Sequence, residues 1–202
     1  EMPGMYPDGE YDLAGFAVGI VEKDEIIDGK SIKPGDVVIG LASSGPHSNG
    51  FSLIRKVVEV SGADWNMPFD GATLADRAME PTRIYVKQVL NVMKSVKIKG
   101  MAHITGGGLV ENIPRVLPEG TQCVVHADSW KRPAIFDWLQ EKGNIDAHEM
   151  HRVFNNGIGL VVIVSAEDAD RAMEAFKAEG EKAFRIGEIS TLPAGEAPCV
   201  VL

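Results

Sequence analysis

Stretches with strand-like and helix-like hydrophobic spacing alternate along most of the chain. Buried β-strands are predicted at five places: residues 36–41, 100–104, 122–126, 158–164 and 184–189. Helices with one apolar face are predicted over residues 51–60, 82–96, 133–142 and 165–180, and residues 61–71 are predicted as loop. Because strands alternate with helices, we expect an α/β domain of the layered α+β kind, a mixed sheet with packed helices.

Two of these helices have recognisable ends. Pro81 precedes the helix at 82–96, whose apolar stripe consists of Tyr85, Val86, Val89, Leu90 and Met93. The segment 165–168 resembles a capping box. It would open a helix that turns four apolar side chains inward and ends at Gly180: Ala169, Ala172, Met173 and Phe176.

The first thirty residues have a different pattern. Residues 11–21 are apolar and predict a β-strand, and a charged segment, 22–33, separates this strand from everything after it. That segment is the candidate domain boundary. The chain begins with Glu1 in a loop-like stretch, and we expect this start to be a cut end.

Composition narrows the choice of partners. Of 202 residues, 20 are basic and 29 are acidic, for a net charge of −9, which argues against a nucleic-acid-binding protein. Small phosphorylated ligands remain possible, because a few backbone amides can hold a phosphate. Cys123 and Cys199 form no paired motif and are interpreted as buried or tail thiols in a reducing cytoplasm. No apolar run approaches the roughly 20 residues of a membrane span, so no membrane partner is expected.

Two segments share one pattern, in which a buried strand runs into a glycine-rich loop and then a helix. The first loop is 42–50, ASSGPHSNG, and the second is 105–108, TGGG. Glycine lets a backbone approach a ligand closely, and a helix start offers unpaired N–H donors. Both loops are therefore candidate anion sites. The alternative is that they only turn the chain and cap a helix.

Four other sequence patterns are candidates for functional motifs, and none supports a phosphate-binding, metal-binding or hydrolase site. Gly29-Lys30-Ser31 imitates the end of a phosphate-binding loop, but Asp24 stands where that loop needs glycine. His148 and His151 are three residues apart, which does not fit a zincin helix, and a solvated polar face is favoured there. His103 and His126, at strand ends, are interpreted as hydrogen-bonded structural residues. No serine-hydrolase elbow, Gly-x-Ser-x-Gly, is present.

The amino-acid sequences of these segments resemble those of one enzyme family. The segments EMPGMY, DLAGFAVG, SSGPHSNGFSLIRKV, PTRIYVK, HITGGGLVENIPRVLP and FNNGIG, in this order, resemble the phosphoribosylformylglycinamidine cyclo-ligases, also called aminoimidazole ribonucleotide synthetases. The resemblance extends to about residue 189. Formylglycinamidine synthase, selenophosphate synthetase and thiamine-phosphate kinase share the architecture.

The resemblance implies two α/β halves, of which this chain contains mainly the second. Residues 1–23 would be a remnant of the N-terminal ATP-binding and dimerisation domain, and residues 24–202 the C-terminal substrate-binding domain. Glu1 matches the end of an acidic motif near the nucleotide and metal, and no metal ligand is assigned within this chain. ATP and Mg²⁺ would bind mostly to the missing half. The full-length protein would be a cytoplasmic homodimer, and this chain alone would be inactive.

The resemblance also implies the reaction. ATP would phosphorylate the formyl amide oxygen of formylglycinamidine ribonucleotide, and the amidine nitrogen would then close the aminoimidazole ring. His47 and Asn49 are the expected catalytic residues, with His47 handling a proton or orienting the formyl amide. The expected substrate- and phosphate-binding residues are Ser44, Gly45, Ser48, Thr105, Gly106, Gly107, Gly108 and Asn112. A sibling ATP-dependent enzyme and a non-catalytic module that binds a phosphorylated metabolite remain alternatives.

Overall fold

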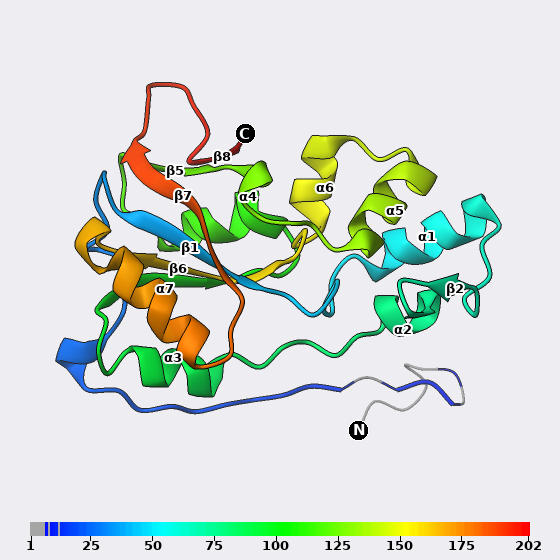
Figure 1. Ribbon diagram of the computed structural model, residues 1–202, viewed down its shortest axis with the longest axis horizontal. Coiled ribbons are helices and arrows are strands. Elements are labelled where there is room, and N and C mark those ends of the chain that lie inside the picture. The colour runs from blue at the N-terminus through cyan, green and yellow to red at the C-terminus, as the bar shows by residue number, and fades with distance from the viewer. Residues whose placement is uncertain (1–6, 8, 12) are drawn as a thin grey trace.

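The computed structural model describes residues 7, 9–11 and 13–202, and a six-stranded mixed sheet forms its centre (Figure 1). The strands lie in the order β4-β6-β1-β7-β5-β8. Neighbours are antiparallel except for β5 and β8, which are parallel. Their bounds are β1 Val37–Ala42, β4 Ile98–His103, β5 Thr121–Val125, β6 Ile158–Val164, β7 Ala183–Thr191 and β8 Cys199–Val201. The sheet confirms the predicted fold class and all five strands predicted after residue 33.

Alternate residues of the central strands feed two hydrophobic cores on opposite faces of the sheet. On one face, α4 (Gly108–Asn112) and the 3₁₀ turn η2 (Ile113–Val116) pack against side chains such as Val38 and Val161. On the other face, α3 (Val86–Val92) and α7 (Ala169–Ala178) pack against side chains such as Ile39 and Val162. The sheet is therefore covered by helices on both faces.

A third core lies beyond one end of the sheet, where four helices gather (Figure 1). These are α1 (Phe51–Ser61), α2 (Leu74–Ala78), α5 (Ala134–Gly143) and α6 (Ala147–Val153). Phe136, Leu139, Met150 and Phe154 are fully buried between them. A small hairpin, β2 (Pro68–Phe69) and β3 (Ala72–Thr73), precedes α2, and the remaining 3₁₀ turns are η1 (Lys23–Glu25), η3 (Ala127–Ser129) and η4 (Ala166–Asp168).

The predicted strand at 11–21 is wrong within this chain. Residues 11 and 13–21 form no strand, and the side chains of Leu13, Phe16 and Ile20 are 89%, 94% and 100% exposed. A strand needs a neighbour to accept its backbone hydrogen bonds. None is adjacent to this segment among the described residues.

The helix predicted at 82–96 is shorter than expected. It spans Val86–Val92, because residues 81–85 are bound to a neighbouring loop. Tyr85 and Val89 are buried as predicted, whereas Val86 and Leu90 face outward. The predicted loop at 61–71 contains β2, and the polar segment that includes His148 and His151 forms α6, whose Met150 is buried.

The C-terminal tail contains a strand that the sequence did not predict. β8 pairs with β5 so that Cys123 and Cys199, far apart in the chain, become register partners. Both thiols are free and buried, as expected for buried cysteines. Hydrogen bonding to Cys199 and burial raise the pKa of Cys123. Ser165 opens η4 and then α7 by accepting from the Asp168 amide at 3.3 Å, and α7 ends near Gly180, whose φ is 81°.

Candidate functional site

The first glycine-rich loop runs from the end of β1 to the start of α1 and is held by one buried amide side chain. Asn155, from the FNNG segment before β6, is 1% exposed. Its Oδ1 accepts from the Ser43 hydroxyl at 3.1 Å and from the Gly157 amide at 2.8 Å, and its Nδ2 donates to the Gly45 carbonyl at 2.9 Å. Loop 43–50 is therefore fixed to the segment that begins β6.

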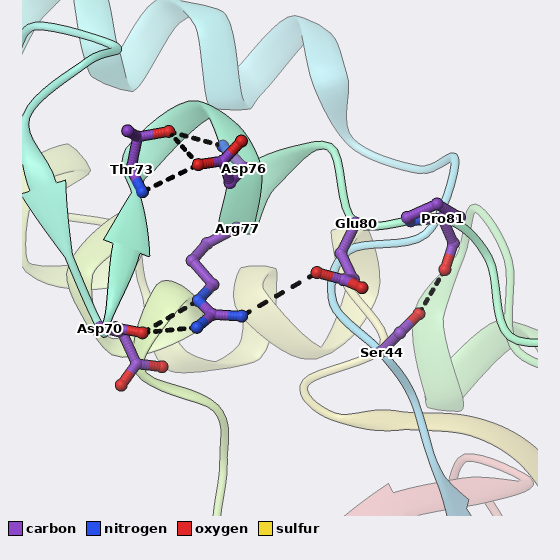
Figure 2. Close-up of polar contacts among 7 residues, drawn as sticks. All are labelled: Ser44, Asp70, Thr73, Asp76, Arg77, Glu80 and Pro81. Carbon is purple, nitrogen blue, oxygen red and sulfur yellow. Dashed lines mark hydrogen bonds and ion pairs between the residues drawn. The ribbon is translucent and has the colours of Figure 1, made fainter.

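A second segment, residues 81–85, lies along the same loop. The Ser44 hydroxyl donates to the Pro81 carbonyl at 2.6 Å (Figure 2), and the Ser48 and Thr82 hydroxyls are 3.3 Å apart. Tyr85 donates its hydroxyl proton to the Ala42 carbonyl at 2.8 Å, at the loop's entrance. Segment 81–85 and loop 43–50 thus form one hydrogen-bonded unit.

The residues before Pro81 are also anchored (Figure 2). Thr73 and Asp76 form a capping box at the start of α2. Arg77 donates through Nε and Nη2 to the Asp70 carbonyl at 3.0 and 2.6 Å, and its Nη1 lies 3.9 Å from Glu80. The four-helix end of the molecule therefore supports the segment that borders the loop.

His47 is enclosed within this unit. It has a positive φ of 58°, is 4% exposed, and accepts at Nε2 from the amides of Ser44 (3.2 Å) and Arg83 (3.4 Å). Burial, together with the nearby charges of His103 and Arg83, lowers the pKa of His47 to about 4. His47 is thus neutral at pH 7, with its proton on Nδ1, and Nδ1 has no partner among the described residues.

Three aromatic rings meet at the end of the sheet. The ring centroids of His47, Tyr85 and His103 are 6.3 to 6.5 Å apart. Two of them, Tyr85 and His47, lie over Gly159 of β6, where an added Cβ would clash with the Tyr85 hydroxyl and lie 2.5 Å from His47 Cε1. The His103 side chain is exposed and makes no hydrogen bond among the described residues, so its interpretation as a hydrogen-bonded structural residue is wrong.

The second glycine-rich loop, the TGGG turn, is shaped from behind by Asn112. This side chain is 3% exposed and donates to the carbonyls of Thr105, Gly106 and Gly108, while its Oδ1 accepts from the Thr105 hydroxyl. The polar groups of Asn112 and the Thr105 hydroxyl are therefore committed to the turn itself.

The three glycines of the turn differ in what they require. Gly107 and Gly108 have φ values of +98° and +56°, and a Cβ on Gly108 would also meet backbone carbonyl oxygens of α6 and its C-cap. Gly106 has no positive φ and is exposed. The amides of Gly106 and Gly107 have no acceptor among the described residues. The turn thus contains two backbone donors without an acceptor in the described part of the chain, one of them on an exposed residue.

The structure brings the two loops together. A Cβ built on Gly106 would lie 4.0 Å from Asn49 Oδ1, its nearest neighbour outside the turn. Of the expected site residues, Ser44, Ser48 and Gly106 are exposed, Asn49, Thr105 and Gly107 are half-buried, and four are buried: Gly45, His47, Gly108 and Asn112. Glu1 lies outside the described residues.

Four residues at this site were not assigned from sequence: Arg83, Tyr85, Asn155 and Glu181. Arg83 and Tyr85 belong to PTRIYVK and Asn155 to FNNGIG, both of which stand out in the sequence, whereas no pattern indicates Glu181. Glu181 is 4% exposed and accepts from Arg83 Nε at 2.8 Å.

One cleft of the molecule lies apart from the two loops. A cleft of about 960 Å³ lies between residues 21–31 and the region where α3 leads into β4, away from both loops. Within the described ranges, no three histidine, cysteine or acidic side chains gather as metal ligands, and no helix is long and apolar enough to cross a bilayer.

Comparison with known proteins decides the family. The model of the AIR synthase related protein, C-terminal domain, matches residues 33–197, which include both loops and segment 81–85. The chain belongs to this family. Two relatives named phosphoribosylformylglycinamidine cyclo-ligase align over all 202 residues. The one from Cupriavidus taiwanensis is 58% identical and that from Paraburkholderia xenovorans 61%, and the chain spans only 58% and 57% of their lengths.

Solved structures share the fold of the AIR synthase related C-terminal domain at low sequence identity. The hydrogenase maturation protein HypE in complex with ATP is 20% identical, with a TM-score of 0.61 over 90% of this chain and 51% of that one. Thiamine-monophosphate kinase from Stenotrophomonas maltophilia is 15% identical, with a TM-score of 0.61 over 90% and 54%. T. maritima PurL complexed with FGAR is 16% identical, with a TM-score of 0.55 over 91% and 28%.

Proposed function

We propose that this chain supplies the substrate-binding part of a phosphoribosylformylglycinamidine cyclo-ligase. The observation that carries the proposal is the meeting of the TGGG turn and loop 43–50 at one end of the sheet, in a chain 58–61% identical to proteins of that name. The domain division at residue 23, the homodimer and the cytoplasmic location belong to the same proposal. With a net charge of −9, no nucleic-acid partner is proposed, and no membrane partner either.

In this proposal the TGGG turn holds a phosphate of formylglycinamidine ribonucleotide through the free amides of Gly106 and Gly107. Asn112 acts from behind, as the residue that keeps the turn in shape, and Thr105 supports it. Backbone donors that are already in place stabilise an anion without reorganising when it binds. The turn is therefore assigned to phosphate binding.

Loop 43–50 would face the formylglycinamidine group. Ser48 and Asn49 have side chains at the surface of the loop, and Ser44 and Gly45 fix its shape. Of the two roles expected for His47, proton handling or orientation, the structure favours orientation. Its Nε2 already accepts two amide protons, and its lowered pKa keeps it neutral. His47 is thus a positioning residue in this proposal.

Ring closure requires the attacking amidine nitrogen to lose a proton. The exposed His103, beside His47 and Tyr85, is the imidazole of this site that a ligand can reach, and we assign it the role of proton acceptor. After the formyl oxygen is phosphorylated, the amidine nitrogen attacks that carbon, and phosphate leaves with the oxygen.

ATP and Mg²⁺ would be bound mainly by the part of the relatives that this chain does not cover. ATP supplies the phosphoryl group that converts the formyl oxygen into a leaving group. The residues of this chain would bind and orient the ribonucleotide and accept its proton.

A hybrid enzyme tests the proposal. This chain replaces the matching part of the Cupriavidus taiwanensis cyclo-ligase, and ATP-dependent formation of aminoimidazole ribonucleotide is measured, with the 202-residue chain alone as the comparison. We expect turnover by the hybrid, and binding without turnover by the chain alone. A folded hybrid that binds the ribonucleotide without turnover would favour the non-catalytic module. Turnover of a different phosphoryl acceptor would favour a sibling enzyme.

A further inference from the structure

We infer that Arg83 is a phosphate-binding residue of this site, held in place by the buried carboxylate of Glu181. The inference rests on the proposed function for the ligand, a phosphorylated ribose. It adds a side-chain phosphate contact to the backbone donors of the TGGG turn, from a residue of the PTRIYVK segment that was not assigned a site role from sequence.

The two edges of the Arg83 guanidinium lie in different surroundings. Its Nε donates to Glu181 Oε2 at 2.8 Å, and the Glu181 side chain is completely buried, whereas the Arg83 side chain is 38% exposed. The Nη atoms of Arg83 have no acceptor among the described residues. A buried partner therefore fixes one edge, and the outer donors remain free for a ligand.

The position of Arg83 is set by the loop that it borders. Its backbone amide donates to His47 Nε2, and its neighbour Thr82 contacts Ser48. Burial is the largest influence on the pKa of both His47 and Tyr85. The positive charge of Arg83 also lowers the pKa of His47, and it opposes the increase that burial causes in the pKa of Tyr85. The guanidinium thus lies beside the ring cluster at which the two loops meet.

Two buried polar atoms in this neighbourhood lack partners. Glu181 Oε1 and His47 Nδ1 are inaccessible and make no hydrogen bond among the described residues. Unpaired buried polar groups are uncommon. Both atoms are inaccessible, so they are not ligand contacts themselves, and the part of Glu181 in the site is to hold the Arg83 guanidinium through its other oxygen.

The chemistry fits a phosphate. A guanidinium presents paired N–H donors in a plane, which matches two phosphate oxygens, and charge-assisted hydrogen bonds of this kind are the strong ones. The chain as a whole has a net charge of −9 and repels anions at long range. Phosphate binding therefore requires a cation that is fixed at the site. Because Glu181 neutralises part of the Arg83 charge, the arrangement of the Arg83 donors contributes more to binding than the charge itself.

Calorimetry on the 202-residue chain with ribose 5-phosphate and with ribose tests the inference. Arg83→Met should weaken binding of ribose 5-phosphate by about 10- to 100-fold and leave binding of ribose unchanged. Arg83→Lys should recover only part of the loss, because lysine lacks the paired donors. Arg55→Met is the matched control, since it removes the same charge from the exposed side of α1 and should change affinity less than about twofold.

A titration of the unaltered chain, followed by NMR of the arginine side chains, covers the case in which Arg83→Met fails to fold. The Arg83 Nη signals should shift with ribose 5-phosphate and not with ribose. Absence of any shift, or absence of ribose 5-phosphate binding altogether, overturns the inference. So does a phosphate site that Gly106→Val abolishes and Arg83→Met leaves intact.

The proposed function fails separately. If the chain binds ribose 5-phosphate through Arg83 but the hybrid enzyme does not act on formylglycinamidine ribonucleotide, the phosphate site stands and the cyclo-ligase assignment falls.

Discussion

Loop 43–50 and the TGGG turn follow the same sequence pattern but are built in opposite ways. In loop 43–50, side chains form the network, with Asn155, His47 and Ser44 each bonded within the protein. In the TGGG turn, the Asn112 side chain bonds to the turn's own carbonyls, and the amides of Gly106 and Gly107 have no acceptor among the described residues. The same order of strand, glycine-rich loop and helix can therefore produce either a rigid loop with internally bonded side chains or a turn with free backbone amides.

The two loops differ in whether their polar groups bond within the protein or remain available to a ligand. A loop whose donors and acceptors are satisfied internally contributes shape and rigidity, and it offers a ligand only its outermost groups, here Ser48 and Asn49. A loop whose own carbonyls are bonded by one buried side chain, as Asn112 does in the TGGG turn, keeps its amides available for a ligand. Three predictions test this contrast, and they run from the largest expected change in the free energy of unfolding or binding to the smallest.

The largest effect is expected from the amide that braces loop 43–50. Asn155→Ala removes three hydrogen bonds and leaves buried partners unsatisfied, so we expect a loss of about 3 kcal/mol in the free energy of unfolding. Urea denaturation measures it. Asn49→Ala, at a half-buried amide whose side chain makes no hydrogen bond among the described residues, should change stability by less than about 0.5 kcal/mol. Equal losses in both variants would contradict the bracing role.

A second effect should appear as the pH is lowered. The pKa of His47 is about 4 in the folded chain and about 6.5 when unfolded, so the unfolded state binds the proton first. The His47 contribution is complete above pH 6.5 and is lost between about pH 6.5 and 4, with a slope of up to roughly 1.4 kcal/mol per pH unit.

The comparison variant for this slope is His47→Gln. Urea unfolding at pH 7 and pH 4.5 should show a smaller pH dependence in the variant than in the unaltered chain. Burial also lowers the pKa of His151, so some of the slope will remain. Identical slopes in the two proteins would mean that His47 titrates normally when folded.

The smallest change in free energy is expected at the TGGG turn. There a substitution should affect ligand binding and leave the free energy of unfolding unchanged. Gly106→Val adds a branched side chain to the exposed residue that carries one of the free amides, without backbone strain. Affinity for formylglycinamidine ribonucleotide should fall more than tenfold, about 1.4 kcal/mol, with unfolding unchanged. Gly106→Ala should have a smaller effect. Unaltered affinity in folded Gly106→Val would remove the turn from the site.

The sheet was largely predictable because its central strands are apolar in nearly every position. Residues 158–164 and 36–41 lie between two helical layers, so their patterns required no knowledge of their neighbours. Residues 11–21 have similar apolar character but no adjacent strand among the described residues, and strand formation depends on such a partner. Sequence periodicity indicates a preference, and pairing decides the outcome.

The predicted site was less complete, because its geometry depends on contacts between distant residues. Ser44 meets Pro81 across 37 residues and Arg83 meets Glu181 across 98, and no local pattern indicates either pair. The same contacts explain the shortened helix before Val86. His103 was dismissed because a lone histidine at a strand end has no motif. Its exposure and the nearby rings become visible only when β4 lies beside β6.

The strand order also has a kinetic consequence. No two strands that follow one another in the chain are neighbours in the six-stranded sheet, and β1 pairs only with β6 and β7, more than 100 residues later. Each pairing must close a long loop before it gains any stabilising contact, which is typical of slow folding. Asn155 lies in the same late segment, so loop 43–50 can take its final shape only after most of the chain has been ordered. Ligand-binding competence should therefore appear late in refolding, well after the helices have formed.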